Sequence, residues 1–248
     1  MGRGRRHRGW GITLACYPLR SRCVLFSSGQ AKTYKRTWDR KEDITKVDTA
    51  TKLSTERFAE GMTIQQFRDN MQKNREIYDD NYQNFKLKPE DQAFFKSFGK
   101  KLNVMVLAED WCGDVLRYLP IFQQIAETVP NWEVRVFLRD ENTDLADLCL
   151  KEGKYRAIPV IKFLDENMGE MSCFIERPMA VYEAEKSMGS LFAAKYPEIA
   201  DALAPVDEMS EETRPLYTQF AREFRAESRR AWQQLFVEDI KNRVGTNS

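Results

Sequence analysis

The sequence predicts an α/β fold, in which a mixed sheet is flanked by helices, and three observations carry this prediction. Short runs with strand character alternate with helical patterns between residues 104 and 192. Two of these runs are joined by the turn Asp165–Gly169, which is typical of a hairpin. The motif Trp111-Cys112-Gly113 stands where the first strand passes into a helix, so a thiol is expected at a helix N-terminus.

Four segments have the pattern of strands. A short apolar run between charged residues is typical of a buried strand, and strict alternation is typical of a half-buried one. The predicted strands are Val104–Ala108, Val134–Leu138, Pro159–Leu164 and Met171–Ile175.

Helical spacing of apolar residues surrounds and separates these strands. It begins at Leu53, includes the capping-box pair Thr63 and Gln66, and continues to Phe85. Pro89 is suited to open a further short helix. The other predicted helices are Gly113–Val129 with Pro120 inside it, Asp144–Glu152, Ala180–Phe192 and a long amphipathic helix over Pro215–Val244.

These patterns divide the chain of 248 residues into four parts. We expect residues 1–50 to form a basic, disordered tail and residues 51–101 to form a helical N-terminal extension. Residues 102–196 form the α/β domain. Residues 197–248 form a linker and the C-terminal helix.

Charge is distributed unevenly along the chain. The first 38 residues contain seven Arg, two Lys and no acid, whereas the rest contains 30 basic and 38 acidic residues. The tail has the composition of either a disordered extension or an organelle transit peptide, and both interpretations stay open. It gives no specific signal for nucleic-acid binding, and no apolar run is long enough to span a bilayer.

The cysteine and histidine content excludes several classes of site. The five cysteines are odd in number and widely spaced, which fits a reducing compartment such as the cytoplasm. His7, in the tail, is the only histidine, so catalysis by a Cys-His pair and histidine-based metal sites are excluded from the rest of the chain. We therefore expect no metal and no cofactor.

Opposing charges surround the thiol of Cys112. The amides and the positive end of the helix favour a thiolate, whereas Glu109, Asp110 and Asp114 disfavour it by repulsion. The nearest cation in sequence is Arg117. The sequence alone does not give the balance of these effects.

Several motifs in this order resemble the thioredoxin family. Trp111-Cys112-Gly113 is similar to the start of the family's active-site helix, and Pro120 is similar to its internal proline. Asp140-Glu141-Asn142 and Tyr155-Arg156-Ala157-Ile158-Pro159 resemble the family's next strand end and its approach to the cis-proline loop. The resemblance covers about residues 102–192, and the run Ala-Glu-Asp-Trp-Cys-Gly-Asp resembles a bacterial branch of the family. It implies a thioredoxin-like fold with a cis Ile158-Pro159 bond beside Cys112.

The chain also departs from the family pattern. Val115 stands in place of the resolving cysteine, and Asp114 in place of the proline between the two cysteines. Val106 stands in place of the buried aspartate that serves the second thiol. An intramolecular disulfide of the usual kind is therefore excluded. Cys149 and Cys173 are expected to be buried structural residues, although either could serve as a resolving thiol.

The resemblance implies a thiol–disulfide oxidoreductase of monothiol type, in which Cys112 forms mixed disulfides with a protein or a low-molecular-weight thiol. The expected supporting residues are Trp111, Gly113, Asp114, Asp110, Ile158 and Pro159. The alternative is a non-catalytic binding or adaptor module that uses the proline groove without redox chemistry. Whether the chain is an enzyme, and its oligomeric state, stay open.

Overall fold

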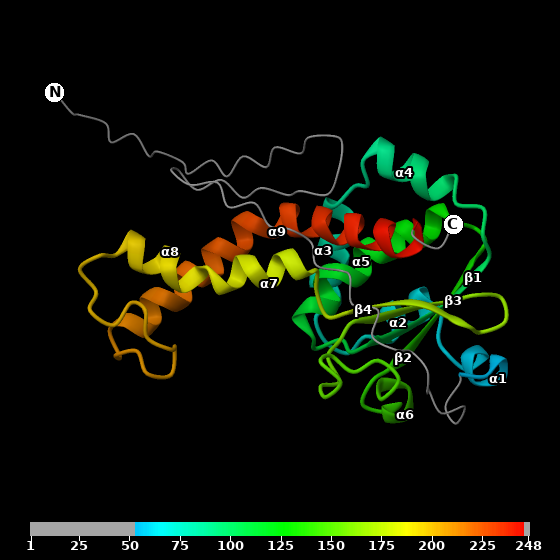
Figure 1. The fold of residues 1–248 in the computed structure, drawn as a ribbon, viewed down its shortest axis with the longest axis horizontal. Coiled ribbons are helices and arrows are strands. Elements are labelled where there is room, and N and C mark those ends of the chain that lie inside the picture. Colours follow the sequence, from blue (N-terminus) through cyan, green and yellow to red (C-terminus); the bar gives the residue numbers. More distant parts are fainter. Residues whose placement is uncertain (1–52, 246–248) are drawn as a thin grey trace, which may run out of the picture. The chain divides into compact units, whose positions relative to one another are not determined.

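The computed structural model describes residues 53–245. The predicted basic tail over residues 1–50 lies outside the described residues. The described part is built on a four-stranded sheet with the order β2-β1-β3-β4 (Figure 1). The strands are β1 (Leu102–Ala108), β2 (Trp132–Leu138), β3 (Val160–Leu164) and β4 (Glu170–Ile175).

The sheet is mixed, as predicted. Strands β1 and β2 are parallel, whereas β1 and β3, and then β3 and β4, are antiparallel. All seven residues of β1 are buried, because this central strand is covered on both faces. The hairpin predicted around Asp165–Gly169 is present, and Asp165 Oδ1 accepts hydrogen bonds from the amides of Asn167 and Gly169.

Helices precede, connect and follow the strands, which confirms the predicted fold class with its N-terminal helices and long C-terminal helix. They are α1 (Thr55–Ala59), α2 (Ile64–Asn70), α3 (Arg75–Asn84), α4 (Pro89–Lys96), α5 (Gly113–Thr128), α6 (Thr143–Ala146), α7 (Met179–Lys186), α8 (Met188–Lys195) and α9 (Thr213–Gly245). Within residues 53–245, no helix combines the length and the apolar composition needed to cross a membrane.

One face of the sheet packs against α5 and α9 through aromatic rings. Phe174 of β4 meets Phe236 of α9 with ring centroids 5.0 Å apart, and Phe236 stacks on Tyr118 of α5 at 5.1 Å. Phe163 of β3 packs edge-on against Phe122 of α5. The turn after α6 covers the opposite face, and Figure 1 shows α6 and α9 on opposite sides of the sheet. The long C-terminal helix is therefore part of the core.

A polar clamp also holds α9 to α4. The carboxylate of Asp91 is fully buried and accepts hydrogen bonds from Lys241 Nζ and Gln234 Nε2, both at 2.8 Å. A buried carboxylate needs such partners, because its desolvation is otherwise costly.

The N-terminal helical segment is divided into more helices than the spacing of its hydrophobic residues indicated. The expected capping box is present, since Thr63 accepts from the Gln66 amide and the Gln66 side chain accepts from the Thr63 amide. The pattern from Leu53 to Phe85 nevertheless forms three helices. Asn74, with a left-handed φ of 58°, separates α2 from α3 and starts a new helix direction.

Two other predicted helices differ from the structure. The helix predicted over Asp144–Glu152 ends at Ala146, and Lys151 instead forms a short antiparallel bridge with Tyr155. Glu152 and Gly153 both have positive φ, which a helix interior does not accept. The helix predicted over 180–192 is broken at Ser187, whose hydroxyl donates to the Ala184 carbonyl.

The outer edge of β2 is covered by the residues that precede α2. Met62 exchanges two backbone hydrogen bonds with Val136, in an isolated antiparallel bridge. A Cβ on Gly61 would lie 2.7 Å from both Arg135 and Phe137, so the chain can approach this closely only with glycine.

Candidate thiol site

Cys112 lies directly beyond the C-terminal end of the central strand. It is the N-cap residue of α5 with an extended backbone, and its carbonyl accepts the first helical hydrogen bond from Leu116. Four apolar residues of the first two turns, Val115, Leu116, Tyr118 and Leu119, are buried and fix the helix on the sheet. The thiol is therefore held at a helix start by core packing.

The loop before β3 lies beside this thiol, as the resemblance implied. The Ile158–Pro159 peptide bond is cis. Cys112 Sγ donates to the Ile158 carbonyl oxygen across 3.6 Å, and the Pro159 carbonyl accepts from the Glu176 amide at 2.8 Å. Cys112 is half-buried and lines a cavity.

Burial dominates the ionisation of Cys112. Desolvation raises the pKa of the thiol, and the charge of Asp114 adds to this effect. The amides of Val115 and Asp114 and the charge of Arg139 lower the pKa, but the net direction is upward. The resting group is consequently a thiol that donates a hydrogen bond, and burial with the charge of Asp114 outweighs the helix amides and Arg139.

Asp114 is at the centre of an ion-pair network. Its carboxylate accepts from Arg117 Nη1 at 3.0 Å and also from Arg177 Nη2. Arg177 further pairs with Glu176 and Glu185, and Glu185 accepts from Arg225 Nε of α9 at 3.1 Å. Only 19% of the Arg177 side chain is exposed, so this network is largely shielded from solvent.

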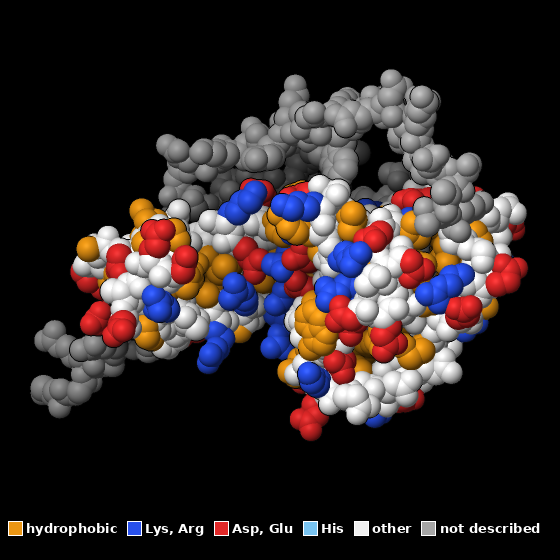
Figure 2. Space-filling model, turned by 90° about the horizontal axis from the view of Figure 1, so that it is seen from below, with side chains coloured by type: hydrophobic (Ala, Val, Ile, Leu, Met, Phe, Trp, Pro, Cys, Tyr) orange, Lys and Arg blue, Asp and Glu red, His pale blue; other side chains and the backbone are white. Residues whose placement is uncertain are grey.

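These side chains line a cavity at Cys112. The cavity has a volume of about 270 Å³ and is lined by Cys112, Gly113, Asp114, Arg117, Arg177, Glu185 and Arg225. Its walls come from α5, the β4–α7 connection, α7 and α9. The lining carries three arginines and two carboxylates, so the cations are in excess by one. The face of the molecule drawn in Figure 2 likewise carries acidic and basic side chains intermixed.

Asp110 connects the thiol turn to the N-terminal helices. Its Oδ2 accepts from the amides of Gln72 and Lys73 at 2.8 and 2.9 Å, and its carbonyl accepts from Asn74 Nδ2. These contacts position the turn that carries Cys112 against residues that lie more than 35 positions earlier in the sequence.

Trp111 and Gly113 flank the thiol on the outside. Trp111 is 46% exposed, and the guanidinium of Arg139 lies 5.0 Å from its ring centroid. Gly113 is exposed and has open space at its Cβ position, so the motif does not need glycine for steric reasons.

Sequence reasoning named the thiol, its proline loop and the nearby Asp114 and Arg117, but it missed Glu185 and Arg225 of the charged lining. Glu185 and Arg225 reach the cavity from α7 and α9, and no local motif marks them. Arg139, whose charge lowers the pKa of Cys112, was missed as well. Cys149 and Cys173 lie next to each other, with Sγ atoms 2.7 Å apart. Cys149 is buried as expected, whereas Cys173 is only half-buried.

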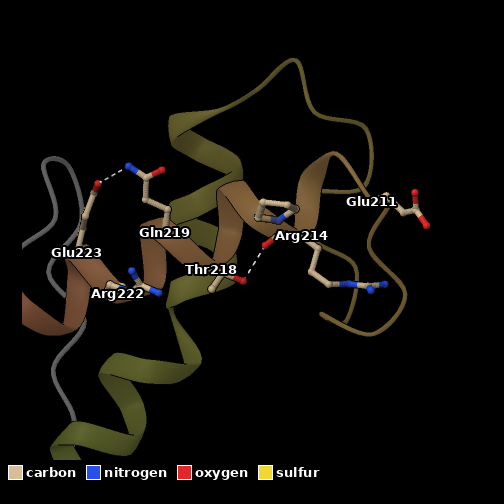
Figure 3. Close-up of a pocket in the computed structure, with 7 residues that line it drawn as sticks. Glu211, Arg214, Thr218, Gln219, Arg222 and Glu223 are labelled. Carbon is tan, nitrogen blue, oxygen red and sulfur yellow. Dashed lines mark hydrogen bonds between the residues drawn. The ribbon is translucent and has the colours of Figure 1, made fainter.

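A larger hollow of about 740 Å³ lies along the first turns of α9. Figure 3 shows its charged and polar lining, with Thr218 donating to the Arg214 carbonyl and Gln219 donating to Glu223. No cysteine lines this hollow, so it offers no thiol chemistry.

Comparison with known proteins agrees with this architecture. The family model described as Thioredoxin matches residues 61–189, which include α2 to α4 as well as the strands. The search of curated proteins gives no match.

Two solved structures are similar to the chain. The crystal structure of an HIV epitope-scaffold has 15% identity and a TM-score of 0.50, and the match covers 76% of this chain and 95% of that one. A protein of unknown function from Pseudomonas aeruginosa has 22% identity and a TM-score of 0.45, with 59% and 92% coverage. The first likeness supports the fold alone. Since the family match spans more than half of the sequence, the chain belongs to the thioredoxin family.

Proposed function

We propose that the chain is a monothiol thiol–disulfide exchange protein that acts through Cys112. The observation that carries the proposal is the position of this sulfur, 3.6 Å from the Ile158 carbonyl and open to a cavity. A ligand held along the Pro159 loop would place its own sulfur beside Cys112. The partners we expect are a protein or a low-molecular-weight compound that carries a thiol or disulfide.

The chemistry needs two partners in succession. The Cys112 thiolate attacks one sulfur of a disulfide, the S–S bond of the ligand breaks, and its second sulfur leaves as a thiolate. An external thiol then attacks the mixed disulfide and releases Cys112. Val115, fully buried in the first turn of α5, offers no thiol for an internal resolution step.

The raised pKa of Cys112 sets the pH dependence of this reaction. Burial holds the group as a thiol at neutral pH, and only the thiolate attacks. The rate of exchange should therefore rise with pH until the thiol has titrated. A bound ligand that replaces the hydrogen bond to the Ile158 carbonyl would change the ratio of thiol to thiolate at Cys112.

The charged lining, with three arginines and two carboxylates, supports a polar ligand. Arg225 is 43% exposed at its side chain and pairs only with Glu185 among the contacts described, so a ligand carboxylate could compete for its guanidinium. A free thiol as the working group also supports a reducing compartment, such as the cytoplasm, as the site of action.

The experiment is covalent trapping with a matched pair of full-length proteins. The first carries Cys112 and the second carries Cys112→Ser, and both are incubated with a mixed small disulfide and with cell extract before non-reducing separation. We expect adducts that form only with Cys112 and that an added thiol releases. Equal capture of the same partners by Cys112→Ser would instead support a non-redox binding module and refute the exchange reaction.

A further inference from the structure

A second pair of thiols lies on the face of the sheet that carries the α6 turn. Cys149 follows α6, and its amide donates to the Ala146 carbonyl. Cys173 lies on the edge strand β4, with its side chain on the face opposite to Phe174 and the aromatic core. The Cys173 thiol donates to Cys149 Sγ across 2.7 Å, and both cysteines are free.

A buried lysine accompanies this pair. Lys162 of β3 is directly opposite Cys173 in the sheet register, so both side chains project from the same face. Only 7% of the Lys162 side chain is exposed. Its Nζ pairs with Glu170 at 2.7 Å and donates to the Leu148 carbonyl, next to Cys149.

We propose that Cys149 and Cys173 form a second redox site, which hydrogen peroxide oxidises to a disulfide between the α6 turn and β4. The two sulfurs are already close, and a disulfide requires an S–S distance of about 2.05 Å, which small side-chain rotations can supply. Cys149 is buried, so a small oxidant fits this site better than a bulky disulfide.

The surroundings divide the roles between the two sulfurs. The hydrogen bond from Cys173 and the charge of Lys162 lower the pKa of Cys149, against the opposing effect of burial. The same hydrogen bond and burial raise the pKa of Cys173. Lys162 Nζ donates to the Leu148 carbonyl next to Cys149, so we assign Cys149 as the nucleophile and Cys173 as the resolving thiol.

The reaction balances with peroxide as the only oxidant. The Cys149 thiolate attacks one peroxide oxygen, the O–O bond breaks, and hydroxide leaves to become water, which gives a sulfenic acid. Cys173 Sγ then attacks the sulfenic sulfur, an S–S bond forms, the S–O bond breaks, and a second water leaves with the Cys173 proton. Two thiols lose two electrons in total, and one peroxide gains them.

The site is separate from Cys112 and does not depend on the proposed exchange reaction. Lys162 pairs with Met105 in the middle of β1, whereas Cys112 follows the end of that strand. Oxidation of the pair would link the α6 turn to the sheet, while Cys112 stays free. The pair is thus suited to respond to peroxide independently of any mixed disulfide.

The test uses the full chain with Cys16, Cys23 and Cys112 each replaced by Ser, so that only Cys149 and Cys173 remain. Peroxide is added, and the protein is alkylated and analysed by intact mass and by non-reducing peptide mapping. We expect a loss of two hydrogens, simultaneous loss of both alkylation sites, a linked Cys149–Cys173 peptide, and full reversal by dithiothreitol. Cys149→Ser should leave Cys173 open to alkylation after the same treatment.

Lys162→Met should slow the oxidation by several-fold if the charge activates Cys149. Lys154→Met, the same change at an exposed lysine, is the matched control and should not alter the rate. The proposal is overturned if peroxide takes Cys149 to a sulfinic acid while Cys173 remains alkylatable, or if the two thiols react independently. Either result concerns this pair alone and leaves the Cys112 trapping experiment unaffected.

Discussion

The alkylation rate of Cys112 should rise steeply with pH and should level off only at an alkaline pH. Only the thiolate reacts, and desolvation of the half-buried sulfur raises the pKa of Cys112 above its ordinary range. A free thiol with a pKa of about 8.5 gains roughly 25-fold in thiolate between pH 7 and pH 9. A thiol that titrates higher approaches the limit of roughly 100-fold over the same interval.

The assay measures iodoacetamide incorporation at the peptide that carries Cys112, between pH 6 and pH 10, in the native full-length chain. The same measurement on Cys112 in urea provides the reference for an unburied thiol. We expect slower reaction than the reference at pH 7 and a log-linear rise with a slope near one. A plateau at or below pH 8 would mean that the helix amides and Arg139 outweigh burial, and the reasoning on Cys112 would then be wrong.

Three further predictions concern the residues around this thiol and the clamp on α9. Val115→Cys should create a dithiol, because side chains three residues apart on a helix are within reach of a disulfide. After oxidation, non-reducing peptide mapping should show a disulfide between Cys112 and the new thiol, and its absence would contradict the described first turn of α5. Asp114→Asn should lower the free energy of unfolding by roughly 1.5–3 kcal/mol, because it removes the charged acceptor of Arg117 and Arg177. It should also lower the pKa of Cys112. Urea denaturation measures the first effect and the alkylation profile the second, and an unchanged urea midpoint would argue against the ion-pair network. Asp91→Ala should lower the free energy of unfolding by about 3 kcal/mol, because it leaves Lys241 without its buried partner. A decrease below about 0.5 kcal/mol would argue against the packing of α9 on α4.

The order of strands and helices could be predicted because it depends on local patterns. The apolar run Val104–Ala108 marks a strand covered on both faces, and every residue of it is buried. Pro215–Val244 has an apolar stripe of helical spacing, and α9 places Phe236 from that stripe against the sheet. Both signals are complete within one segment of sequence.

Helix boundaries were predicted less well, because they depend on single backbone conformations. The helix expected over Asp144–Glu152 stops at Ala146, since the chain turns to pair Lys151 with Tyr155. The left-handed conformation of Asn74 divides a continuous apolar pattern into α2 and α3. Neither conformation changes the periodicity of hydrophobic residues, so the pattern alone does not reveal it.

In the candidate site, too, the features set by local sequence could be predicted and those set by long-range packing could not. The motif located Cys112 and the Ile158-Pro159 loop, because strand ends and their connecting loops meet at one edge of such a sheet. Apart from Arg117, which is three positions from Asp114, the partners of Asp110 and Asp114 come from residues 36 to 63 positions away, and their identity depends on how the helices pack. The contact between Cys149 and Cys173 likewise requires the register of β3 and β4 together with the path of the α6 turn.

The bridge between Met62 and Val136 affects how the protein behaves at high concentration. An unpaired strand edge is a template on which a second copy can add, and this is a common start of aggregation. Here the Met62 backbone already pairs with the amide and the carbonyl of Val136. At the other edge, the Arg243 side chain donates to the Cys173 carbonyl. Growth of the sheet from copy to copy is thereby hindered at both borders, which favours a chain that remains dispersed when crowded.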